Sequence, residues 1–443
     1  MNYLNSPFFH TYVLPVLYGA IIVAVLPLLA GYIVLVERKV MADMQARLGP
    51  MRVGPHGLLQ PIADALKLLI KEDIIPEKAD RFLFWMAPVL SVGMALLAYA
   101  AIPFGPVFQV ADLNVGLLFI LAISSLGIYG IVLGGWASNS HYSLLGALRS
   151  AAQLVSYETA AGLGIVSALV WAGSLSMKAI VQAQYDRGIW FIAYVPVGFF
   201  IYLVGSIAET NRAPFDLPEA ESELVAGYMT EYSGFRWALY FLGEYANMVV
   251  VAAVATTLFL GGWLRPFVRY HDHFPGTSIE LLDILPTLLF LGAAAYCLRL
   301  TPRQPVKIQK MVMAAVAGLC VILAGVMLAA LFAPPGVMAG IHGAFWFLAK
   351  VGAYIYAFLW FRFTFPRYRF DQLMRLGWRF LIPLALINVI GAATAIVLSE
   401  QWGLHPLPAA LITSAATLGV AVWLASDGAK APTTTAETAG GGD

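Results

Sequence analysis

Residues 12–36 read YVLPVLYGAIIVAVLPLLAGYIVLV and are followed directly by Glu37, Arg38 and Lys39. An apolar run of about 20 residues spans the hydrocarbon core of a bilayer as an α-helix, so this stretch predicts a transmembrane helix. No Lys or Arg precedes the run and three charged residues follow it, which is the reverse of a cleavable signal peptide. We therefore expect an uncleaved membrane anchor with its N-terminus outside the cytoplasm.

Apolar runs of this kind recur throughout the chain. Of the 443 residues, 60% are hydrophobic and 12% are charged, whereas about a quarter of the residues in a soluble domain carry charge. The sequence therefore predicts an all-α polytopic membrane protein with about eleven transmembrane helices. These are expected at residues 12–36, 82–104, 115–135, 152–172, 189–208, 237–263, 281–299, 311–333, 343–361, 379–398 and 406–426.

The charges are balanced in number but not in position. A net charge of +1, from 26 basic and 25 acidic residues, argues against a nucleic-acid partner, which requires a basic field. With alternate loops placed inside, 21 of the 26 Lys and Arg residues fall on the cytoplasmic side. This asymmetry follows the positive-inside rule, and it supports both the helix count and a cytoplasmic C-terminus.

Motifs for a resident cofactor or metal are absent from the sequence. Cys297 and Cys320 lie in apolar runs and form no CxxC pair, which argues against an iron–sulfur or zinc site. The sequence also lacks a P-loop, a dinucleotide-binding fingerprint and an HExxH motif. We therefore expect this chain to bind no metal and no cofactor by itself.

The first cytoplasmic loop contains a predicted surface helix. Within residues 58–72, polar side chains recur every three or four positions among apolar ones, and these are Gln60, Asp64, Lys67 and Lys71. The amphipathic segment is too short to span a bilayer and predicts a helix that lies along the membrane surface. Two Gly-Pro turns precede it, in Arg47-Leu48-Gly49-Pro50 and Arg52-Val53-Gly54-Pro55, and they indicate a connection of fixed shape.

Four ionisable residues fall within or at the ends of expected membrane helices: Glu158, Glu209, Glu244 and Lys350. A charge at mid-membrane costs about 2.5–3.5 kcal/mol on insertion scales, so such residues are candidates for function. A structural interpretation competes at each, since Glu158 could pair with Arg149, and Lys350 with Glu244, only to hold helices together. We favour a water-filled proton path, because these groups enter from one leaflet or reach toward it.

The second long cytoplasmic loop is acidic. Its segment Asp216-Leu217-Pro218-Glu219-Ala220-Glu221-Ser222-Glu223 fits ordinary helix-start chemistry, with an Asp cap, a Pro in the first turn and Glu near the positive end of the helix dipole. Starting a helix does not require three carboxylates at alternate positions. Neighbouring like charges raise one another's pKa, so such a group can also share a proton near neutral pH. The residues alone leave both interpretations open.

Both loops resemble one family, the H subunits of bacterial respiratory complex I, the NADH:quinone oxidoreductase, whose mitochondrial counterpart is the first NADH dehydrogenase membrane subunit. The resemblance rests on long ordered matches. These are residues 37–67, residues 136–158, the string ETNRAPFDLPEAESELVAGY at 209–228, the segment Glu244-Tyr245-Ala246-Asn247-Met248, and residues 362–374. A chance match to the 209–228 string is not credible.

The resemblance implies a subunit that forms most of a quinone chamber and begins a chain of carboxylates leading to proton-pumping subunits. It assigns to the chamber Glu37, Arg38, Arg47, Arg52, Asp64, Lys67 and Lys71. It assigns to the proton path Glu158, Glu209, Asp216, Glu219, Glu221, Glu223, Glu244 and Lys350, with Arg149, Arg212 and Arg362 as ion-pair partners. Quinone is the expected substrate, and iron–sulfur clusters, FMN and NADH are expected on partner subunits, so no complete active site is expected on this chain.

The sequence departs from the family pattern in its helix count. The family has eight spanning helices, and three more are expected here. We expect a family core at 1–263 and 341–400, an inserted helix pair at 264–340, an extra helix at 401–427 and a disordered tail at 428–443. The expected location is the inner (plasma) membrane of a bacterium, with the other complex I subunits, quinone and lipids as partners.

Three rival functions are open from the sequence. A membrane-bound hydrogenase or a ferredoxin- or deazaflavin-linked dehydrogenase has an equivalent subunit that shares the acidic loop, but the completeness of both loops favours the quinone-linked enzyme. A secondary transporter would show internal repeats, and the sequence has none. A purely structural anchor explains the surface helix and the basic loops but leaves Glu158, Glu244 and Lys350 unexplained.

Overall fold

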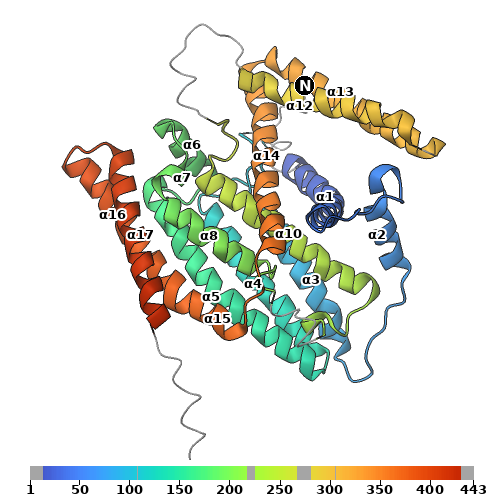
Figure 1. The fold of residues 1–443 in the computed structure, drawn as a ribbon, viewed down its shortest axis with the longest axis horizontal. Coiled ribbons are helices and arrows are strands. Elements are labelled where there is room, and N and C mark those ends of the chain that lie inside the picture. Colours follow the sequence, from blue (N-terminus) through green and yellow to red (C-terminus); the bar gives the residue numbers. More distant parts are fainter. Residues whose placement is uncertain (1–12, 107, 217–224, 267–280, 305, 431–443) are drawn as a thin grey trace, which may run out of the picture.

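The computed structural model describes residues 13–106, 108–216, 225–266, 281–304 and 306–430. Every regular element in this part of the chain is helical (Figure 1). Within it, ten helices are long and apolar enough to cross a membrane. The prediction of an all-α polytopic membrane protein is therefore confirmed.

The long helices follow the predicted apolar runs. They are α1 (Leu14–Met44), α3 (Arg81–Ala98), α4 (Gly116–Ala137), α5 (His141–Ala172), α10 (Gly234–Phe259), α12 (Leu281–Leu300), α13 (Lys307–Leu331), α14 (Pro335–Thr364), α16 (Ile382–Gln401) and α17 (Pro406–Lys430). Shorter elements connect them: η3 (Pro55–Gly57), α2 (Gln60–Ile70), η4 (Tyr99–Ala101), α6 (Met177–Arg187), η5 (Gly227–Met229), η6 (Thr301–Arg303), α15 (Phe370–Arg375) and a π-helical turn, η7 (Leu376–Leu381).

The expected span at 189–208 is divided into two helices. A short α7 (Phe191–Tyr194) is followed by α8 (Pro196–Glu209), and Val195 between them has non-helical backbone angles. Pro196 starts α8 because a proline lacks the N–H that would continue the preceding helix. At 14 residues, α8 rises about 21 Å and is shorter than the ten long helices, so the count of eleven spans stays a prediction.

A central bundle of α3, α4, α5, α8 and α10 holds most of the buried core (Figure 1). Small residues let these helices approach closely, as is usual in membrane bundles. A Cβ on Gly130 of α4 would lie 2.8 Å from the backbone nitrogen of Ser91 in α3. A Cβ on Gly205 of α8 would lie 2.7 Å from the Cβ of Ala161 in α5. These contacts fix the spacing of the helices that carry the candidate site.

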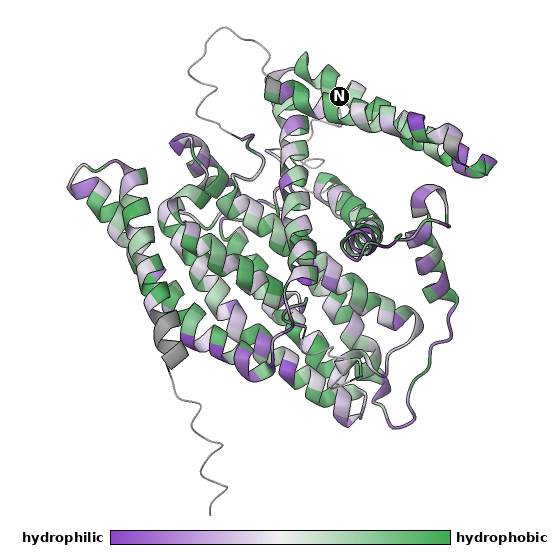
Figure 2. Ribbon diagram, viewed as in Figure 1, coloured by the Kyte–Doolittle hydropathy of each residue, from purple (hydrophilic) through white to green (hydrophobic). Residues whose placement is uncertain are grey.

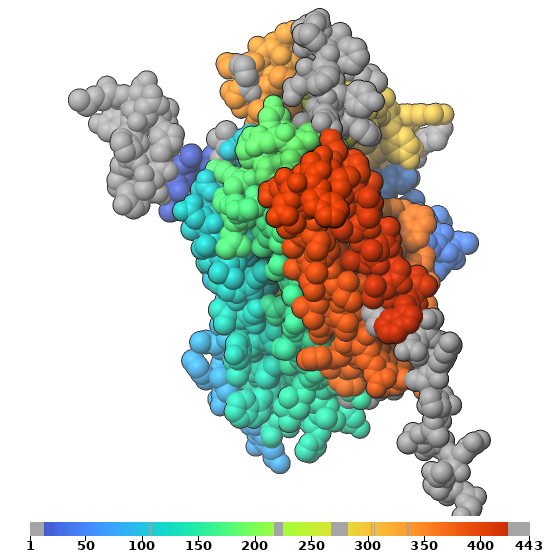
Figure 3. All heavy atoms as spheres, turned by 90° about the vertical axis from the view of Figure 1, so that its left-hand side faces the viewer, coloured from blue at the N-terminus to red at the C-terminus, as the bar shows by residue number. Residues whose placement is uncertain are grey.

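Peripheral helices flank the bundle on two sides. On one side α1 and α14 pack against α10, and on the other α16 and α17 form a pair against α5 and α8, which Figure 3 shows as adjacent orange and red helices. Apolar residues cover the long helices, whereas hydrophilic residues gather near their ends and on α2 (Figure 2). The α17 helix extends to Lys430, three residues beyond the predicted boundary, and residues 431–443 lie outside the described residues.

The predicted inserted pair corresponds to α12 and α13, which form a helical hairpin beside α14 (Figure 1). Arg265, which follows α10, donates from Nη1 to both carboxylate oxygens of Asp283 at 2.8 and 2.9 Å and so attaches the start of the hairpin to the end of α10. The α13 helix also contacts η3, between α1 and α2. The hairpin is therefore packed against α14 and η3.

Candidate functional site

An ion cluster joins four distant parts of the chain. We define it as Glu37, Arg212, Glu244, Tyr245 and Arg362. Nη1 of Arg212 lies 3.6 Å from Oε2 of Glu37, and its Nη2 lies 3.6 Å from Oε2 of Glu244. Arg362 of α14 pairs with Oε1 of Glu37. The hydroxyl of Tyr245 donates to Oε2 of Glu37 at 2.7 Å, and the Arg212 guanidinium lies 4.2 Å from the centre of the Tyr245 ring. One cation therefore bridges two carboxylates.

The ion pairs of Arg212 are buried, which makes them costly to break. The side chain of Arg212 is 8% exposed, that of Glu37 is 11% exposed and that of Glu244 is 13% exposed. Removing one partner of a buried ion pair leaves an uncompensated charge, which is far more costly than losing a surface pair. The sequence prediction named all of these charges, and the structure brings them together in one cluster.

The segment that carries Arg212 is held by a second segment, residues 365–369, which follows α14. Arg367 donates from Nη2 to Oδ2 of Asp216 at 3.0 Å, and the Tyr368 ring stacks on Phe215 at a centroid distance of 5.7 Å. Burial raises the pKa of Asp216 to about 6, and the positive charge of Arg367 opposes that rise. Asp216 is therefore a carboxyl that can change its protonation near physiological pH.

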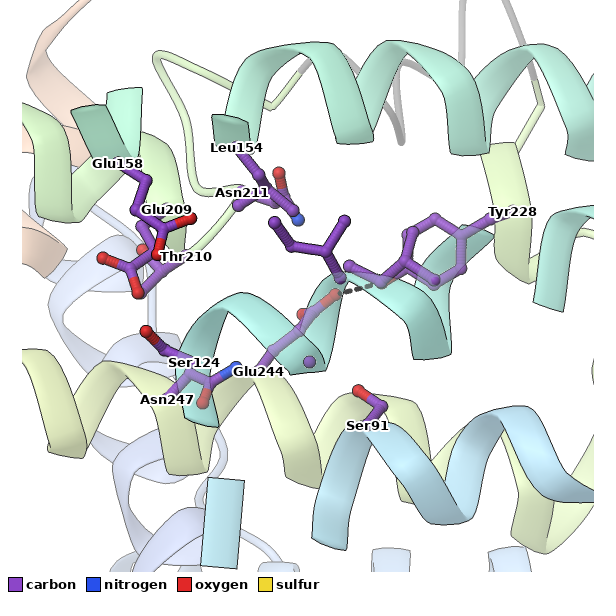
Figure 4. Close-up of a pocket in the computed structure, with 13 residues that line it drawn as sticks. Ser91, Ser124, Leu154, Glu158, Glu209, Thr210, Asn211, Tyr228, Glu244 and Asn247 are labelled. Atoms are coloured by element: carbon purple, nitrogen blue, oxygen red, sulfur yellow. Dashed lines mark hydrogen bonds between the residues drawn. The ribbon is translucent and has the colours of Figure 1, made fainter. Parts of the chain in front are cut away.

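A small carboxylate cavity lies on the other side of Glu244, lined by Glu158 of α5, Glu209 at the end of α8 and Glu244 of α10 (Figure 4). Its volume of about 30 Å³ suits one or two water molecules and excludes an organic ligand. The remaining polar lining residues are Ser91, Ser124, Thr210, Asn211, Tyr228 and Asn247. Three carboxylates from three helices thus face one polar cavity.

The contacts of Glu158 bear on whether it pairs with Arg149 or faces a proton path, the two interpretations left open by the sequence. Its carboxylate accepts a hydrogen bond from Ser125 of α4. Arg149 lies about 13.5 Å away along the axis of α5, with its guanidinium 6.0 Å from the centre of the Phe370 ring. The geometry places Glu158 toward the carboxylate cavity and Arg149 toward α15.

Lys350 lies apart from the carboxylates. Its Nζ donates to the carbonyls of Leu260 at 2.7 Å and Gly262 at 2.9 Å and also to that of Leu264, and it lies 4.4 Å from the centre of the Trp190 ring. Leu260 is sixteen residues beyond Glu244, or about 24 Å along the axis of α10. The competing interpretation, in which Lys350 pairs with Glu244, is therefore excluded, and Lys350 caps the C-terminal end of α10. The prediction that placed Lys350 on the proton path is not supported by these contacts.

A large apolar cavity lies between α1 and α14, with a volume of about 770 Å³. Its lining follows α1 from Tyr18 to Val36 and α14 from Phe347 to Leu359. Two residues of α10 complete it, together with Tyr99, Phe104, Phe108, Gln109 and Val110. Glu37 directly follows Val36, and Arg362 lies one turn beyond Leu359. Along both helices the lining therefore reaches to within one turn of the ion cluster, which suits a ligand with a long apolar part and a polar head.

The structure separates the predicted chamber residues at 37–71 into two groups. Arg38 of α1 pairs with Asp64 of α2 at 2.8 Å, and Gln60 also donates to Asp64 at 2.9 Å, so these residues attach α2 to α1. The other predicted chamber residues are exposed and lie outside the ion cluster: Arg47, Arg52, Lys67 and Lys71. Glu219, Glu221 and Glu223 lie outside the described residues.

Four contributing residues were not predicted: Ser125, Tyr228, Tyr245 and Arg367. The signal for Tyr245 was its position next to Glu244 in the matched segment, and Arg367 lies in the matched segment 362–374. Tyr228 is the last residue of the matched string at 209–228, but nothing in the sequence pairs it with Glu244. Ser125 lies in an apolar run, and no pattern in the sequence distinguishes it. Within the described residues, no group of three or more His, Cys, Asp or Glu side chains is placed to hold a metal ion.

Comparison with known proteins agrees with the geometry. A family model described as NADH dehydrogenase matches residues 17–393. The second of two H subunits of NADH-quinone oxidoreductase from Solibacter usitatus is 55% identical over 396 residues, which cover 87% of this chain and 96% of that protein. The first H subunit from Koribacter versatilis is 53% identical over 86% of this chain and 90% of its own length. The H subunit from Rickettsia canadensis is 42% identical over 90% of this chain and 99% of its own length.

The resemblance drawn from the two loops is thus confirmed over most of the chain, and not only where the signature residues lie. The matched residues 17–393 include α1, α10 and α14, which carry the ion cluster. The chain belongs to the NADH dehydrogenase family, together with the proteins named as H subunits of NADH-quinone oxidoreductase.

Proposed function

We propose that this chain is the membrane subunit of a proton-pumping NADH:quinone oxidoreductase that admits quinone from the bilayer and couples its reduction to proton translocation. The observation that carries the proposal is the contact between three features. Val36 lines the apolar cavity and directly precedes Glu37, Glu37 and Glu244 share Arg212, and Glu244 lines the carboxylate cavity. The polar head of a ligand in the apolar cavity is therefore linked, through Glu37 and Arg212, to the proton-binding groups of the carboxylate cavity.

The chemistry divides between this chain and its partners. Reduction of a quinone to a quinol takes two electrons and two protons, and we assign the electrons to iron–sulfur clusters, FMN and NADH on partner subunits. This chain contributes the apolar cavity, which accommodates the isoprenoid tail, and carboxylates that take up and release protons. Among these we include Glu158, Glu209, Asp216 and Glu244, together with the acidic segment at Glu219, Glu221 and Glu223, but not Lys350, because it caps α10.

Arg212 supplies the link between the two ends. Because a single guanidinium lies between Glu37 and Glu244, a change of charge near Glu37 alters the field at Glu244 directly. Loss of the charge on either carboxylate leaves the cation to the other, so the two side chains act on each other through Arg212. Water in the carboxylate cavity then connects Glu244 with Glu158 and Glu209.

The membrane orientation and the partners are part of the proposal. We place the N-terminus outside and the C-terminus in the cytoplasm, in the inner membrane of a bacterium, because this orientation puts most basic loops inside. On that side the exposed residues Arg47, Arg52 and Lys67 are available to peripheral-arm subunits. Small membrane subunits and lipids are the proposed partners within the bilayer.

Two rival functions, a related hydrogenase or dehydrogenase and a structural anchor, are less well supported than the quinone-linked enzyme. The relatives described above are named as subunits of NADH-quinone oxidoreductase, and none of them supports a hydrogenase or a ferredoxin- or deazaflavin-linked enzyme. A purely structural anchor would need neither an apolar cavity that reaches to within one turn of charges nor three carboxylates around a water-sized cavity. The geometry therefore favours the enzyme over the anchor.

A photoreactive quinone analogue with its reactive group on the tail tests this function in the purified complex. We expect labelling of α1 between Tyr18 and Val36 and of α14 between Phe347 and Leu359, and we expect an excess of native quinone to prevent it. Labelling confined to α12 and α13, or labelling that native quinone does not reduce, would remove the apolar cavity from the quinone route.

A further inference from the structure

Glu244 is held by an ion pair and by a hydrogen bond, which come from different parts of the chain. Its Oε2 lies 3.6 Å from Nη2 of Arg212, and its Oε1 accepts a 3.0 Å hydrogen bond from the hydroxyl of Tyr228. In Figure 4, Tyr228 lies at one end of the carboxylate cavity, Glu158 and Glu209 lie at the other, and Glu244 lies between them. We infer that Tyr228 is a positioning residue, which keeps the Glu244 carboxylate directed into this cavity against the pull of Arg212.

The phenol of Tyr228 is well placed to hold a fixed direction. Tyr228 is 1% exposed, and its ring packs edge-on against Tyr240 of α10 at a centroid distance of 5.3 Å. The turn that carries it, η5, lies directly on α5, because a Cβ on Gly146 would be only 2.7 Å from the Cα of Gly227. The hydroxyl therefore has little freedom to follow a carboxylate that turns away.

A hydroxyl also suits a carboxylate that changes its protonation. Arg212 can only donate hydrogen bonds, so it favours the ionised carboxylate and draws it toward the ion cluster. A phenol both donates and accepts, so Tyr228 can stay bonded to Glu244 whether or not Glu244 carries a proton. The Glu244 carboxyl group then keeps its place at the cavity through both states. This inference rests on the proposed function, in which Glu244 takes up and releases protons.

The test is Tyr228→Phe in the complete complex, reconstituted into phospholipid vesicles. This variant keeps the buried ring and removes only the hydroxyl. We expect assembly to persist and quinone-dependent proton translocation to fall about tenfold, equivalent to about 1.4 kcal/mol. Adding Glu244→Gln to Tyr228→Phe should produce no further fall beyond that of Glu244→Gln alone, because both changes act on one interaction.

Tyr240→Phe is the matched control. Tyr240 is the buried neighbour of Tyr228, and its hydroxyl donates to the carbonyl of Gly130 at 3.1 Å and not to a carboxylate. We expect it to pump at the parental rate. A second readout is the carboxyl band of Glu244 in infrared difference spectra, identified by its loss in Glu244→Gln. Tyr228→Phe should shift this band and Tyr240→Phe should not, which a purely structural role of Tyr228 does not predict.

Three outcomes distinguish the positioning role of Tyr228 from the proposed proton path through Glu244. If Glu244→Gln impairs pumping while Tyr228→Phe pumps at the parental rate with an unshifted band, the positioning role is wrong and the proton path stands. If Tyr228→Phe and Tyr240→Phe lose activity equally, packing explains the effect and the positioning role is again wrong. If Glu244→Gln itself pumps at the parental rate, the proposed path through Glu244 fails, and the role of Tyr228 fails with it.

Discussion

The hydroxyl of Tyr245 donates a 2.7 Å hydrogen bond to Oε2 of Glu37, a residue 208 positions earlier in the sequence. This bond joins α1, which borders the apolar cavity, to α10, which places the preceding residue, Glu244, at the carboxylate cavity. Arg212 lies across the Tyr245 ring and within 3.6 Å of both carboxylates. The two cavities therefore meet through side chains in direct contact, and a change of charge at one acts on the other.

Arg212→Met should destabilise the subunit strongly. The variant leaves Glu37 and Glu244 buried without the shared cation, and breaking a buried ion pair in this way costs about 3–5 kcal/mol. We expect a lower midpoint of thermal inactivation for the purified complex. Arg212→Met combined with Glu37→Gln and Glu244→Gln should recover much of the loss, since no unpaired carboxylate remains. A triple variant as unstable as Arg212→Met would assign the effect to packing.

Asp216→Asn should change the pH dependence of the segment held by Arg367. Burial raises the pKa of Asp216 from 3.8 to about 6 in the folded protein. The folded state then holds a proton that the unfolded state has lost, so the stability from this group is present below about pH 4 and is lost as pH rises to about 6. At pH 7 the variant should be more stable by up to about 3 kcal/mol, at about 1.4 kcal/mol per unit.

Hydrogen exchange of the backbone amides at 212–216 measures this effect locally. In the parental protein protection should fall between pH 4 and pH 6, after correction for the intrinsic exchange rate, whereas Asp216→Asn should show a flat profile. Parallel profiles for the two proteins would mean that Asp216 does not titrate in this range.

Gly146→Ala should have the same effect as loss of the Tyr228 hydroxyl. A Cβ at this position would lie 2.7 Å from the Cα of Gly227, so η5 must move away from α5 and carry Tyr228 with it. Gly162→Ala on the same helix is the matched control, because no atom lies within 4 Å of the added Cβ. We expect slower proton translocation with Gly146→Ala only, measured in vesicles. Equal rates for the two variants would show that η5 can move without disturbing Glu244.

Lys350→Met should lower stability without lowering the pumping rate of the assembled complex. Its ammonium satisfies three carbonyls at the end of α10, and a buried acceptor left without a donor costs about 1–3 kcal/mol. The position lies about 24 Å from Glu244 along α10, so the carboxylate cavity should be unaffected. Thermal inactivation and turnover per assembled complex check the two parts. A stable but non-pumping Lys350→Met would return Lys350 to the proton path.

The helices could be predicted because membrane spans are set by local composition and length. The run at 12–36 and the inserted runs at 281–299 and 311–333 each correspond to an observed helix, since about 20 apolar residues satisfy their own backbone hydrogen bonds only as helix. The run at 189–208 was predicted as one helix and is two. The sequence shows Pro196 but not whether a membrane helix accommodates it as a kink or ends there.

The site could be predicted in its charges but not in its pairings. Glu37 and Arg362 are 325 positions apart, and no periodicity links residues at that separation. Lys350 was assigned to the carboxylates because both are ionisable groups in the membrane, whereas carbonyls at the end of α10 are its partners. Tyr228 was missed, although it ends the matched string at 209–228, because no pattern in the sequence places its hydroxyl 3.0 Å from the Glu244 carboxylate.

The most direct test of the link between the cavities is the number of protons translocated per quinone reduced in vesicles, measured for Glu37→Gln, Glu244→Gln and the double variant. Gln keeps the size and much of the hydrogen-bonding capacity of each side chain while removing its charge. If both carboxylates act through Arg212, each single variant lowers the ratio and the double variant lowers it no further than the worse single one. Parental ratios in both single variants, or independent losses that multiply in the double variant, would contradict the link.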